Sequence, residues 1–300
     1  MRTTLFAPAL GLIFACYIAA RMLEVFAGPV SGQVSSPVPQ LPIVALDVLS
    51  ALCFALIDGS RRNGLRTFLV FAAICIVIGN SIENLGVATG FPYGRYEFLQ
   101  LMGPKLFHVP ILLGLAYIGM AWVSWQVAQA ILQLPAPLTA APTGLRILAL
   151  PAVASFVMVA WDLAQDPVWA TILHGWDWHE GGPWFGVPVS NYLGWYLNVF
   201  LIYTCFALYQ RHALQPARPE PSLWPRLAFY ALCAAGNVLQ LFSPSVRLIV
   251  HDPAGTPWRT SDILAASAIV SIFVMGGFAA IAAARIASSR HEPTGGKARD

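Results

Sequence analysis

The sequence predicts an all-α protein, a polytopic integral membrane helix bundle with seven or eight transmembrane helices. Of its 300 residues, 57% are hydrophobic and 10% are charged, whereas about a quarter of a typical soluble domain is charged. A chain with so little charge cannot cover a soluble surface and needs lipid around it. The apolar residues also gather in runs of about 20, which is the length that crosses a bilayer as a helix.

The first four spans are separated by segments rich in glycine, proline and polar residues, which favour turns. No good small-residue cleavage site follows the first span, so we expect it to be retained. Asp58 is interpreted as a loop charge in the basic turn after the second span. Pro110 lies near the start of the fourth span, where a proline costs little because that N–H has no helical partner. The expected ranges are 5–26, 41–57, 69–87 and 106–132.

The later spans follow a linker rich in proline, alanine and threonine. The fifth span is expected to stop at Asp166, because Pro167 disfavours the helical conformation for the residue before it. Whether the seventh span is a full crossing stays open, so seven and eight spans both fit. Residues 1–288 are predicted to form one transmembrane domain, and 289–300 a disordered tail. The expected ranges are 145–165, 192–209, 227–241 and 263–286.

Lysine and arginine are distributed unequally between the two ends of the expected bundle. With a cytoplasmic N-terminus and eight spans, the non-cytoplasmic side holds only Arg95, Lys105, Arg247 and Arg259, while Arg21 lies within a span. Cytoplasmic loops are enriched in these residue types, so we predict a protein of the cytoplasmic membrane with both termini cytoplasmic. The net charge of +3 is small and no basic stripe with interleaved aromatics occurs, so nucleic-acid binding is not expected.

Ionisable and amide side chains lie near the non-cytoplasmic ends of six spans. An ionisable group at membrane depth costs on the order of 3 kcal/mol, so we infer that these groups share one polar pocket. Two loops rich in aromatic residues, 88–105 and 167–190, would close it. The polar residues concerned are Arg21, Glu24, Asp47, Glu83, Asn84, His108, Asp162, Asp166 and Asn191.

Simpler interpretations are also open. Acids near the end of a span can be interfacial and hydrated, and the tryptophans of the second loop can belong to an ordinary aromatic belt. Arg21 and Glu24 are three residues apart and can form a purely structural pair. A functional pocket is favoured by the tight grouping of Glu83, Asn84, Asp162 and Asp166.

Metal and cofactor chemistry are not expected. His174, His179 and Glu180 are close in sequence, but their spacing fits no helical zinc pair and HExxH is absent. The chain has no GxGxxG fingerprint, P-loop or GxSxG elbow. Its five cysteines lie inside hydrophobic runs without a CxxC pair, so they are interpreted as small apolar residues and no disulfide framework is expected.

What remains is a set of carboxylic acids in an aromatic pocket. An acid in a dry site favours its neutral form and can donate a proton. An electron-rich alkene is a substrate that needs only a proton and water. Protonation gives a tertiary carbocation, which aromatic faces stabilise, and a second carboxylate or amide orients the water that captures it.

Three segments resemble a known family. They are ENLGVATGFPYGRYEF at 83–98, KLFHVP at 105–110, and the motifs WDLAQDP, WDW and GGPWFGVPVSNYLGW within 161–195. In combination they resemble the membrane carotenoid-biosynthesis hydratases, including the bisanhydrobacterioruberin hydratases. The resemblance is strongest from the third span through the sixth. Tyr93 stands where we expect phenylalanine, and Gln165 where we expect an apolar residue.

The resemblance implies a cofactor-independent enzyme that adds water to the terminal double bond of an acyclic ψ-end group, giving a tertiary hydroxyl. Its substrate would be a lycopene-like or monocyclic carotenoid taken from the lipid bilayer. From the residues themselves, the proton donor is Asp162 or Glu83, and Asp166 or the other acid orients water. The expected substrate-binding residues are Asn84, Tyr93, Tyr96, His108, Trp176, Trp178, Trp184, Asn191 and Trp195.

Two alternatives also use buried acids. A proton-coupled transporter or lipid-binding membrane protein would place them near the bilayer midplane, with paired broken helices in two related halves. The sequence shows no such repeat. Another prenyl-lipid isomerase or cyclase would use the same acid and cation chemistry, and only analysis of its product separates it from a hydratase.

Overall fold

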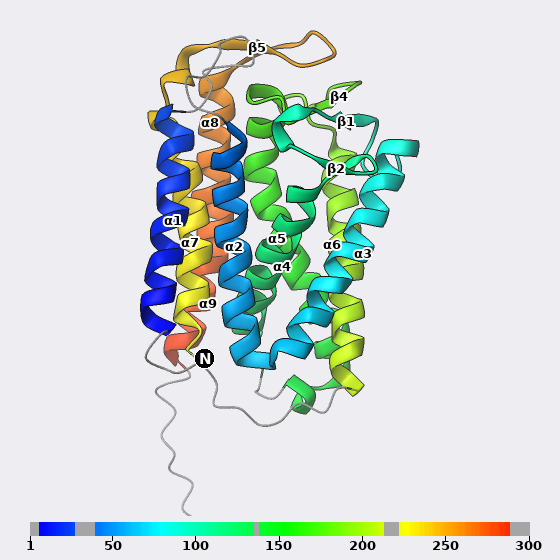
Figure 1. Ribbon diagram of the computed structural model, residues 1–300, viewed down its shortest axis with the longest axis vertical. Helices are drawn as coiled ribbons and strands as arrows, with labels where there is room; N and C mark the ends of the chain where they lie inside the picture. Colours follow the sequence, from blue (N-terminus) through cyan, green and yellow to red (C-terminus); the bar gives the residue numbers. More distant parts are fainter. Residues whose placement is uncertain (1–5, 28–39, 135–137, 213–221, 289–300) are drawn as a thin grey trace, which may run out of the picture.

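The computed structural model describes residues 6–27, 40–134, 138–212 and 222–288, so the predicted tail 289–300 lies outside the described residues. The chain folds into an all-α bundle, as predicted (Figure 1). The helices are α1 (Phe6–Ala27), α2 (Gln40–Asn63), α3 (Leu65–Thr89), α4 (Ile111–Ile131), α5 (Leu150–Pro167), α6 (Val189–His212), α7 (Trp224–Leu239), α8 (Thr260–Ile269) and α9 (Gly276–Ser288).

Short π-helical and 3-10 segments extend or connect these helices. The π-helical segments η4, η5 and η8 make continuous runs with α5 and with α8 and α9. The segments are η2 (Gln100–Met102), η3 (Leu138–Ala140), η4 (Leu145–Ala149), η5 (Val168–Ile172), η6 (Gln240–Phe242), η7 (Pro244–Arg247) and η8 (Val270–Met275).

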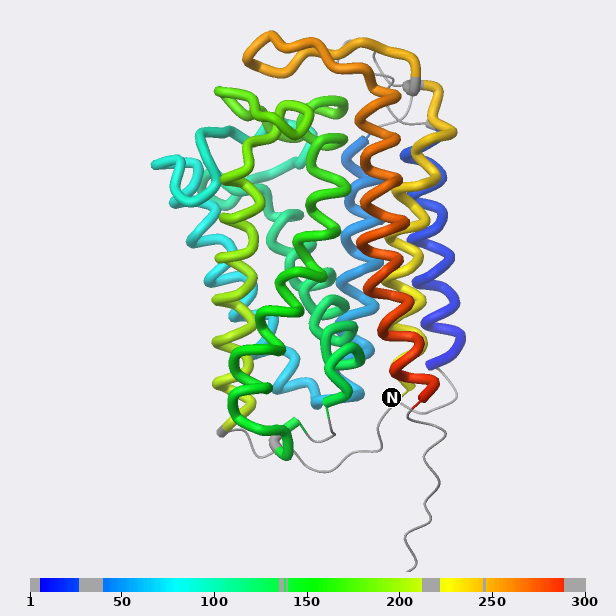
Figure 2. The backbone as a smooth tube through the Cα atoms, turned by 180° about the vertical axis from the view of Figure 1, so that it is seen from behind, coloured from blue at the N-terminus to red at the C-terminus, as the bar shows by residue number. Residues whose placement is uncertain are grey.

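Successive helical runs alternate in direction, with α8, η8 and α9 forming a single run, so the start of α1 and the end of α9 lie at one end of the bundle (Figures 1 and 2). We call this the terminal end, and the opposite one the hairpin end. Within the described residues, seven helical runs are long and apolar enough to cross a membrane, and the protein is an integral membrane protein. They are α1, α2, α3, α4, Leu145–Ile172, α6 and Thr260–Ser288. The 16-residue α7 packs beside α1 in the same bundle.

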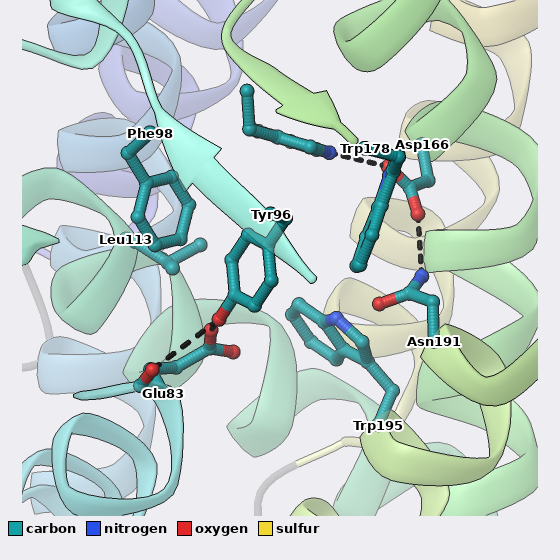
Figure 3. A pocket seen from close by; sticks show the side chains of 9 residues that line it. Glu83, Tyr96, Phe98, Leu113, Asp166, Trp178, Asn191 and Trp195 are labelled. Atoms are coloured by element: carbon teal, nitrogen blue, oxygen red, sulfur yellow. Dashed lines mark hydrogen bonds between the residues drawn. The ribbon is translucent and has the colours of Figure 1, made fainter. Parts of the chain in front are cut away.

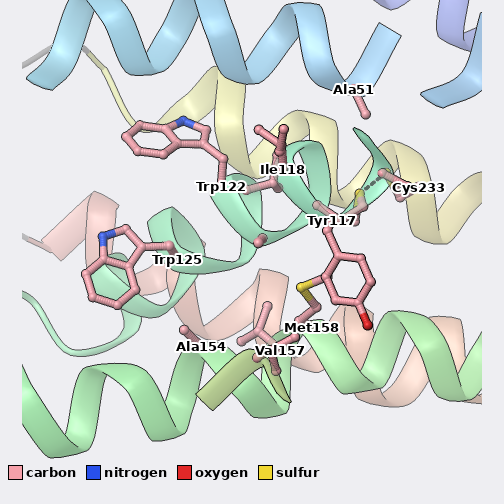
Figure 4. Packing of buried hydrophobic residues seen from close by; sticks show 14 of the residues in the cluster. Ala51, Tyr117, Ile118, Trp122, Trp125, Ala154, Val157, Met158 and Cys233 are labelled. Atoms are coloured by element: carbon pink, nitrogen blue, oxygen red, sulfur yellow. Dashed lines mark hydrogen bonds between the residues drawn. The ribbon is translucent and has the colours of Figure 1, made fainter. Parts of the chain in front are cut away.

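Helix α4 forms the centre of the bundle. It is apolar all round, and it contacts α2, α3, α5, α7 and α9, as expected of a helix that is buried on every side. Figure 4 shows its side chains packed against Ala51 of α2, Val157 of α5 and Cys233 of α7. At Gly119 an added Cβ would lie 2.8 Å from the Cβ of Ala51. Small residues therefore let α2 and α4 approach closely.

Three short antiparallel strand pairs lie at the hairpin end (Figure 1). The pair β1–β4 joins the two aromatic loops, with Tyr96 opposite Trp178 and Phe98 opposite Trp176. The two loops that the sequence predicted to close one pocket are therefore held together by backbone hydrogen bonds. The strands are β1 (Tyr96–Phe98), β2 (Lys105–Leu106), β3 (Val109–Pro110), β4 (Trp176–Trp178), β5 (Ile249–His251) and β6 (Pro257–Arg259).

The predicted end of the fifth span at Asp166 is wrong. The helix continues through Pro167, which keeps helical angles of φ −61° and ψ −30°, and then through η5. The ring of a proline removes one helical hydrogen bond, and the wider π turn that follows is closed by the Leu173 N–H and the Val168 carbonyl at 2.9 Å. Asp166 therefore lies inside a helical run rather than at its end.

The interpretation of Asp58 as a loop charge is also wrong. Helix α2 runs on to Asn63, and Asp58 is buried with 3% exposure. Its Oδ2 accepts hydrogen bonds from Trp122 Nε1 and from Arg226 Nε, both at 2.8 Å. The charge therefore pairs inside the bundle, and it joins α2 to α4 and α7.

We expect Asp58→Ala to lower the free energy of unfolding by about 3–5 kcal/mol, because removing one partner of a buried ion pair leaves the other uncompensated. Denaturant unfolding of the purified protein in detergent measures this. The matched control is Glu97→Ala on β1, whose side chain is 62% exposed and whose loss should change little. Equal stability of the two variants would contradict a stabilising role for the pair.

Candidate active site

A cavity with about 280 Å³ of empty volume lies beneath the β1–β4 pair (Figure 3). We call it the acid pocket. It collects side chains from both aromatic loops and from α3, α4, α5 and α6. Its lining consists of Glu83, Tyr96, Phe98, Leu113, Asp166, Trp176, Trp178, Asn191 and Trp195.

A second cavity, with about 500 Å³ of empty volume, adjoins the acid pocket. We call it the apolar cavity. The two cavities share Leu113, Asp166, Trp176 and Trp195, so Asp166 lies where they meet. The other residues that line the apolar cavity are Val44, Asp47, Val48, Met102, Ala116, Trp161, Asp162, Gln165 and Trp169.

Glu83 of α3 is held by two tyrosine hydroxyls. It is 3% exposed, with Tyr96 Oη donating to its Oε2 at 2.5 Å and Tyr117 Oη donating to its Oε1 at 2.6 Å. Behind them, Asn198 Nδ2 donates to the Tyr93 and Tyr117 hydroxyls at 2.7 and 3.0 Å. Burial and, to a smaller extent, the nearby Glu83 carboxylate raise the pKa of Tyr93 and Tyr96, so both tyrosines of the first aromatic loop stay protonated.

Asp162 and Asp166 lie one helical turn apart on α5, on the same face. Both are buried, and the side-chain amide of Asn191 joins them. Asn191 Nδ2 donates to Asp162 Oδ2 at 3.3 Å and also to Asp166 Oδ2. Trp176 Nε1 donates to the other oxygen, Asp166 Oδ1, at 2.7 Å. Both oxygens of Asp166 thus accept an N–H, as Figure 3 shows, whereas Asp162 accepts one long, shared contact.

Aromatic rings surround the acids. Trp195 stacks on Tyr117 with ring centroids 4.7 Å apart and an interplanar angle of 4°. Trp176 stacks on Trp169 at 5.9 Å, also at 4°. Trp178 packs against Tyr96 at 4.8 Å. Aromatic faces and edges therefore line the space next to the carboxylates, which is an arrangement that stabilises a cation.

A glycine on α6 allows the first aromatic loop to reach the site. At Gly194 an added Cβ would lie 2.5 Å from the ring of Tyr93 and 3.1 Å from the backbone of Pro92. The absence of a side chain here lets the loop carrying Tyr96 rest directly on α6. The position of the Tyr96 hydroxyl beside Glu83 therefore depends on this close approach.

We expect Gly194→Ala to lower the free energy of unfolding by about 1–3 kcal/mol, as overpacking does, because the backbone of Pro92 cannot yield as a flexible side chain would. Thermal unfolding in detergent measures the effect. The control is Gly277→Ala in α9, where an added Cβ meets nothing within 4 Å. This variant should be slightly more stable than the wild type, because alanine favours the helix more than glycine does. Equal melting temperatures for both variants would contradict the packing argument.

The structure brings some predicted residues together and leaves others apart. Glu83, Tyr96, Asp166, Trp176, Trp178, Asn191 and Trp195 line the acid pocket, and Asp162 lines the apolar cavity. Four other predicted substrate-binding residues line neither cavity: Asn84, Tyr93, His108 and Trp184.

These four residues make their contacts outside the two cavities. Asn84 Oδ1 accepts the backbone N–H of His108 at 3.0 Å, so it supports the β2–β3 hairpin, and the His108 side chain is exposed. Tyr93 lies behind Tyr96 and accepts from Asn198. Trp184 Nε1 donates to the Leu163 carbonyl at 3.2 Å and anchors its loop.

Two residues of the Glu83 network, Tyr117 and Asn198, were not predicted. Asn198 carried a usable signal, because Asn191, Trp195 and Asn198 recur at the four- and three-residue spacing of one helical face. Tyr117 carried none, since a tyrosine inside an apolar span is compatible with any environment.

Comparison with known proteins identifies a family for this chain. No curated protein and no solved structure matches the chain. The family described as carotenoid biosynthesis protein matches residues 42–250. This range runs from the start of α2 into β5 and contains every residue that lines the two cavities. The chain belongs to the carotenoid biosynthesis protein family.

Proposed function

We propose that the protein is a carotenoid hydratase that adds water to the terminal C=C of an acyclic ψ-end group without a cofactor. One observation carries the proposal: the buried acids Glu83 and Asp166 line one small cavity, and Asp166 also lines the larger apolar cavity beside it. Membership of a carotenoid biosynthesis family supplies the substrate class. A lycopene-like or monocyclic carotenoid extends along the apolar cavity and places its terminal double bond beside Asp166.

The hydrogen bonds support a different role for each of the two aspartates. Asp166 accepts an N–H at both oxygens, which favours its carboxylate form. Asp162 accepts one contact at 3.3 Å, and it is the neutral acid of the pair, since two carboxylates this close in a dry site do not both ionise. Asp162 is therefore the proton donor and Asp166 the base.

Protonation is the first step. The Asp162 O–H bond breaks, and the π electrons of the terminal alkene form the new C–H bond at the less substituted carbon. The neighbouring carbon becomes a tertiary cation. The faces of Trp176 and Trp195 stabilise it, and the Glu83 carboxylate across the pocket contributes a fixed negative charge.

Capture by water is the second step. Asn191 and Asp166 orient a water molecule, whose oxygen forms the C–O bond to the cation while Asp166 takes a proton. Asn191 contacts both aspartates, so this proton returns to Asp162 over a short path. The net reaction consumes the alkene and one water and gives a tertiary alcohol.

The test is expression in a lycopene-producing host followed by mass spectrometry of the pigments. We expect a product heavier by one water, whose hydroxyl oxygen becomes heavy when the cells grow in heavy-oxygen water. An isomerase or cyclase would give a product with the mass of its substrate. A transporter or lipid-binding protein would leave the pigments unchanged, and either result would overturn the proposal.

The charge distribution supports a site in the outer half of the cytoplasmic membrane, with both chain ends cytoplasmic. Among the described residues, the loops at the hairpin end carry Arg95, Lys105, Arg247 and Arg259, whereas Arg21 lies within α1 near that end. A reporter enzyme that is active only in the cytoplasm should be active when it is fused to the C-terminus. An inactive fusion would show that the orientation is the opposite one. The described basic residues of the terminal end are Arg61, Arg62, Arg66, Arg146, Arg211, Arg226 and Arg285.

A further inference from the structure

A third cavity, with about 290 Å³ of empty volume, lies at the hairpin end beside the apolar cavity. We call it the side cavity. It shares Val44, Asp47 and Trp169 with the apolar cavity, so Asp47 stands at the junction between the two. The remaining residues that line the side cavity are Glu24, Gln40, Ile43, Leu101 and Leu173.

Charged side chains lie at the side cavity although it is buried between apolar helices. Arg21 is 3% exposed, and its Nη1 lies 2.6 Å from Glu24 Oε2 and 4.0 Å from Asp47 Oδ2. Its Nη2 donates to Asn237 Oδ1 at 3.1 Å. The arginine therefore binds Glu24 directly and lies within ion-pair distance of Asp47, which extends the local Arg21–Glu24 pair that the sequence indicates.

Each acid also has one carboxylate oxygen that is buried and accepts no hydrogen bond from the described residues, Oε1 of Glu24 and Oδ1 of Asp47. A buried polar atom without a partner is costly, and water bound in a polar cavity removes that cost. The two oxygens therefore provide water-binding positions, first at the side cavity and then at its junction with the apolar cavity.

We propose that the side cavity is the water inlet of the active site and that Asp47 is the positioning residue that passes water towards Asp162 and Asp166. The inference rests on the proposed function, because a hydratase consumes one water per turnover while its hydrocarbon substrate occupies the apolar cavity. A polar group at the junction lowers the cost of moving water past apolar side chains. The role requires polarity at this position and not a negative charge.

The first experiment compares Asp47→Leu with Asp47→Asn in the pigment assay. We expect Asp47→Leu to lower kcat about tenfold with little change in KM, which is less than the roughly 10²–10⁴-fold that a direct proton-transfer group supplies. Asp47→Asn keeps a polar group and should retain most of the activity. Full activity of Asp47→Leu would overturn the inlet. An equal loss of activity in Asp47→Leu and Asp47→Asn would also overturn it, because Asp47 would then act through its charge.

The second experiment does not depend on hydration. Cysteines introduced at Ile43, in the side cavity, and at Val48, in the apolar cavity, are treated with a small, charged, water-soluble thiol reagent. Both should react faster than Leu49→Cys, a control on the same helix that is 42% exposed on the outside of the bundle, where lipid lies. Labelling of Val48→Cys should be slower in a protein that also carries Asp47→Leu, and it should keep its rate with Asp47→Asn. The wild-type chain gives the background labelling of its own cysteines.

The two experiments separate the two proposals. If no hydrated pigment forms but both introduced cysteines react as expected, the inlet stands and the proposed reaction is wrong. If hydrated pigment forms but Ile43→Cys and Val48→Cys react no faster than Leu49→Cys, the reaction stands and the inlet is overturned.

Discussion

Asp166→Asn lowers the hydration rate by about 10²–10⁴-fold, the range that a positioned acid or base supplies, while the protein still reaches the membrane. Asparagine has nearly the shape of aspartate and keeps one oxygen that accepts from Trp176 or Asn191. It cannot take a proton from the attacking water. The measurement is pigment conversion per amount of protein in the membrane fraction, determined under conditions where substrate is in excess.

Asp162→Asn should cause a loss of similar size, since it removes the proton that starts the reaction. Because the two aspartates act as one unit, the double variant should be little worse than either single variant. The matched control is Glu97→Gln, an exposed acid on β1 that lines neither cavity. Wild-type rates in both aspartate variants would place the chemistry elsewhere.

The local patterns of the sequence were enough to predict much of this site. The four-residue spacing of Asp162 and Asp166 puts both on one helical face whatever the fold around them. Placing an acid at membrane depth costs free energy, which predicts that such acids face the bundle interior. Glu83 lies on another helix, and it faces the interior at the same end of the bundle as the two aspartates. The position of the two aromatic loops at that end predicted that both would close the pocket, although their pairing through β1 and β4 was not predicted.

Features that depend on distant partners could not be predicted. Asp58 looks like a turn residue because glycine, serine and arginine follow it, but its partner Arg226 is 168 residues away, and no local pattern indicates such a pair. Pro167 shows the same limit, since a proline normally ends the helix before it. Here the π turn and the contacts of η5 with the loops above it outweigh that preference.

The side of a helix was harder to predict than the helix itself. Glu83 and Asn84 are neighbours in sequence, and their directions on a helix differ by about 100°. Both were assigned to the pocket, but only Glu83 points into it, while Asn84 binds the β2–β3 hairpin. Gln165, where the family resemblance led us to expect an apolar residue, lines the apolar cavity next to the two aspartates.

Glu83→Gln lowers the hydration rate by about 10²–10³-fold, the loss seen when one preorganised electrostatic group is removed from an active site. Glutamine keeps the size of the side chain, but it removes the negative charge that faces the tertiary cation. It also replaces one accepting oxygen by an amide nitrogen, so either Tyr96 or Tyr117 loses the acceptor for its O–H. KM should change little, because the neutral alkene of the bound substrate does not interact strongly with this charge.

A double-variant cycle tests whether the tyrosines act through Glu83. Tyr117→Phe alone should cost less than Glu83→Gln, and adding it to Glu83→Gln should cost less than the sum of the two, since they share a hydrogen bond. The control is Tyr196→Phe on α6, whose ring packs against Phe156 and lines neither cavity. If Tyr96→Phe or Tyr117→Phe lowers the rate as much as Glu83→Gln does, the hydroxyl itself transfers a proton, and the role of Glu83 is to position that hydroxyl rather than to stabilise the cation.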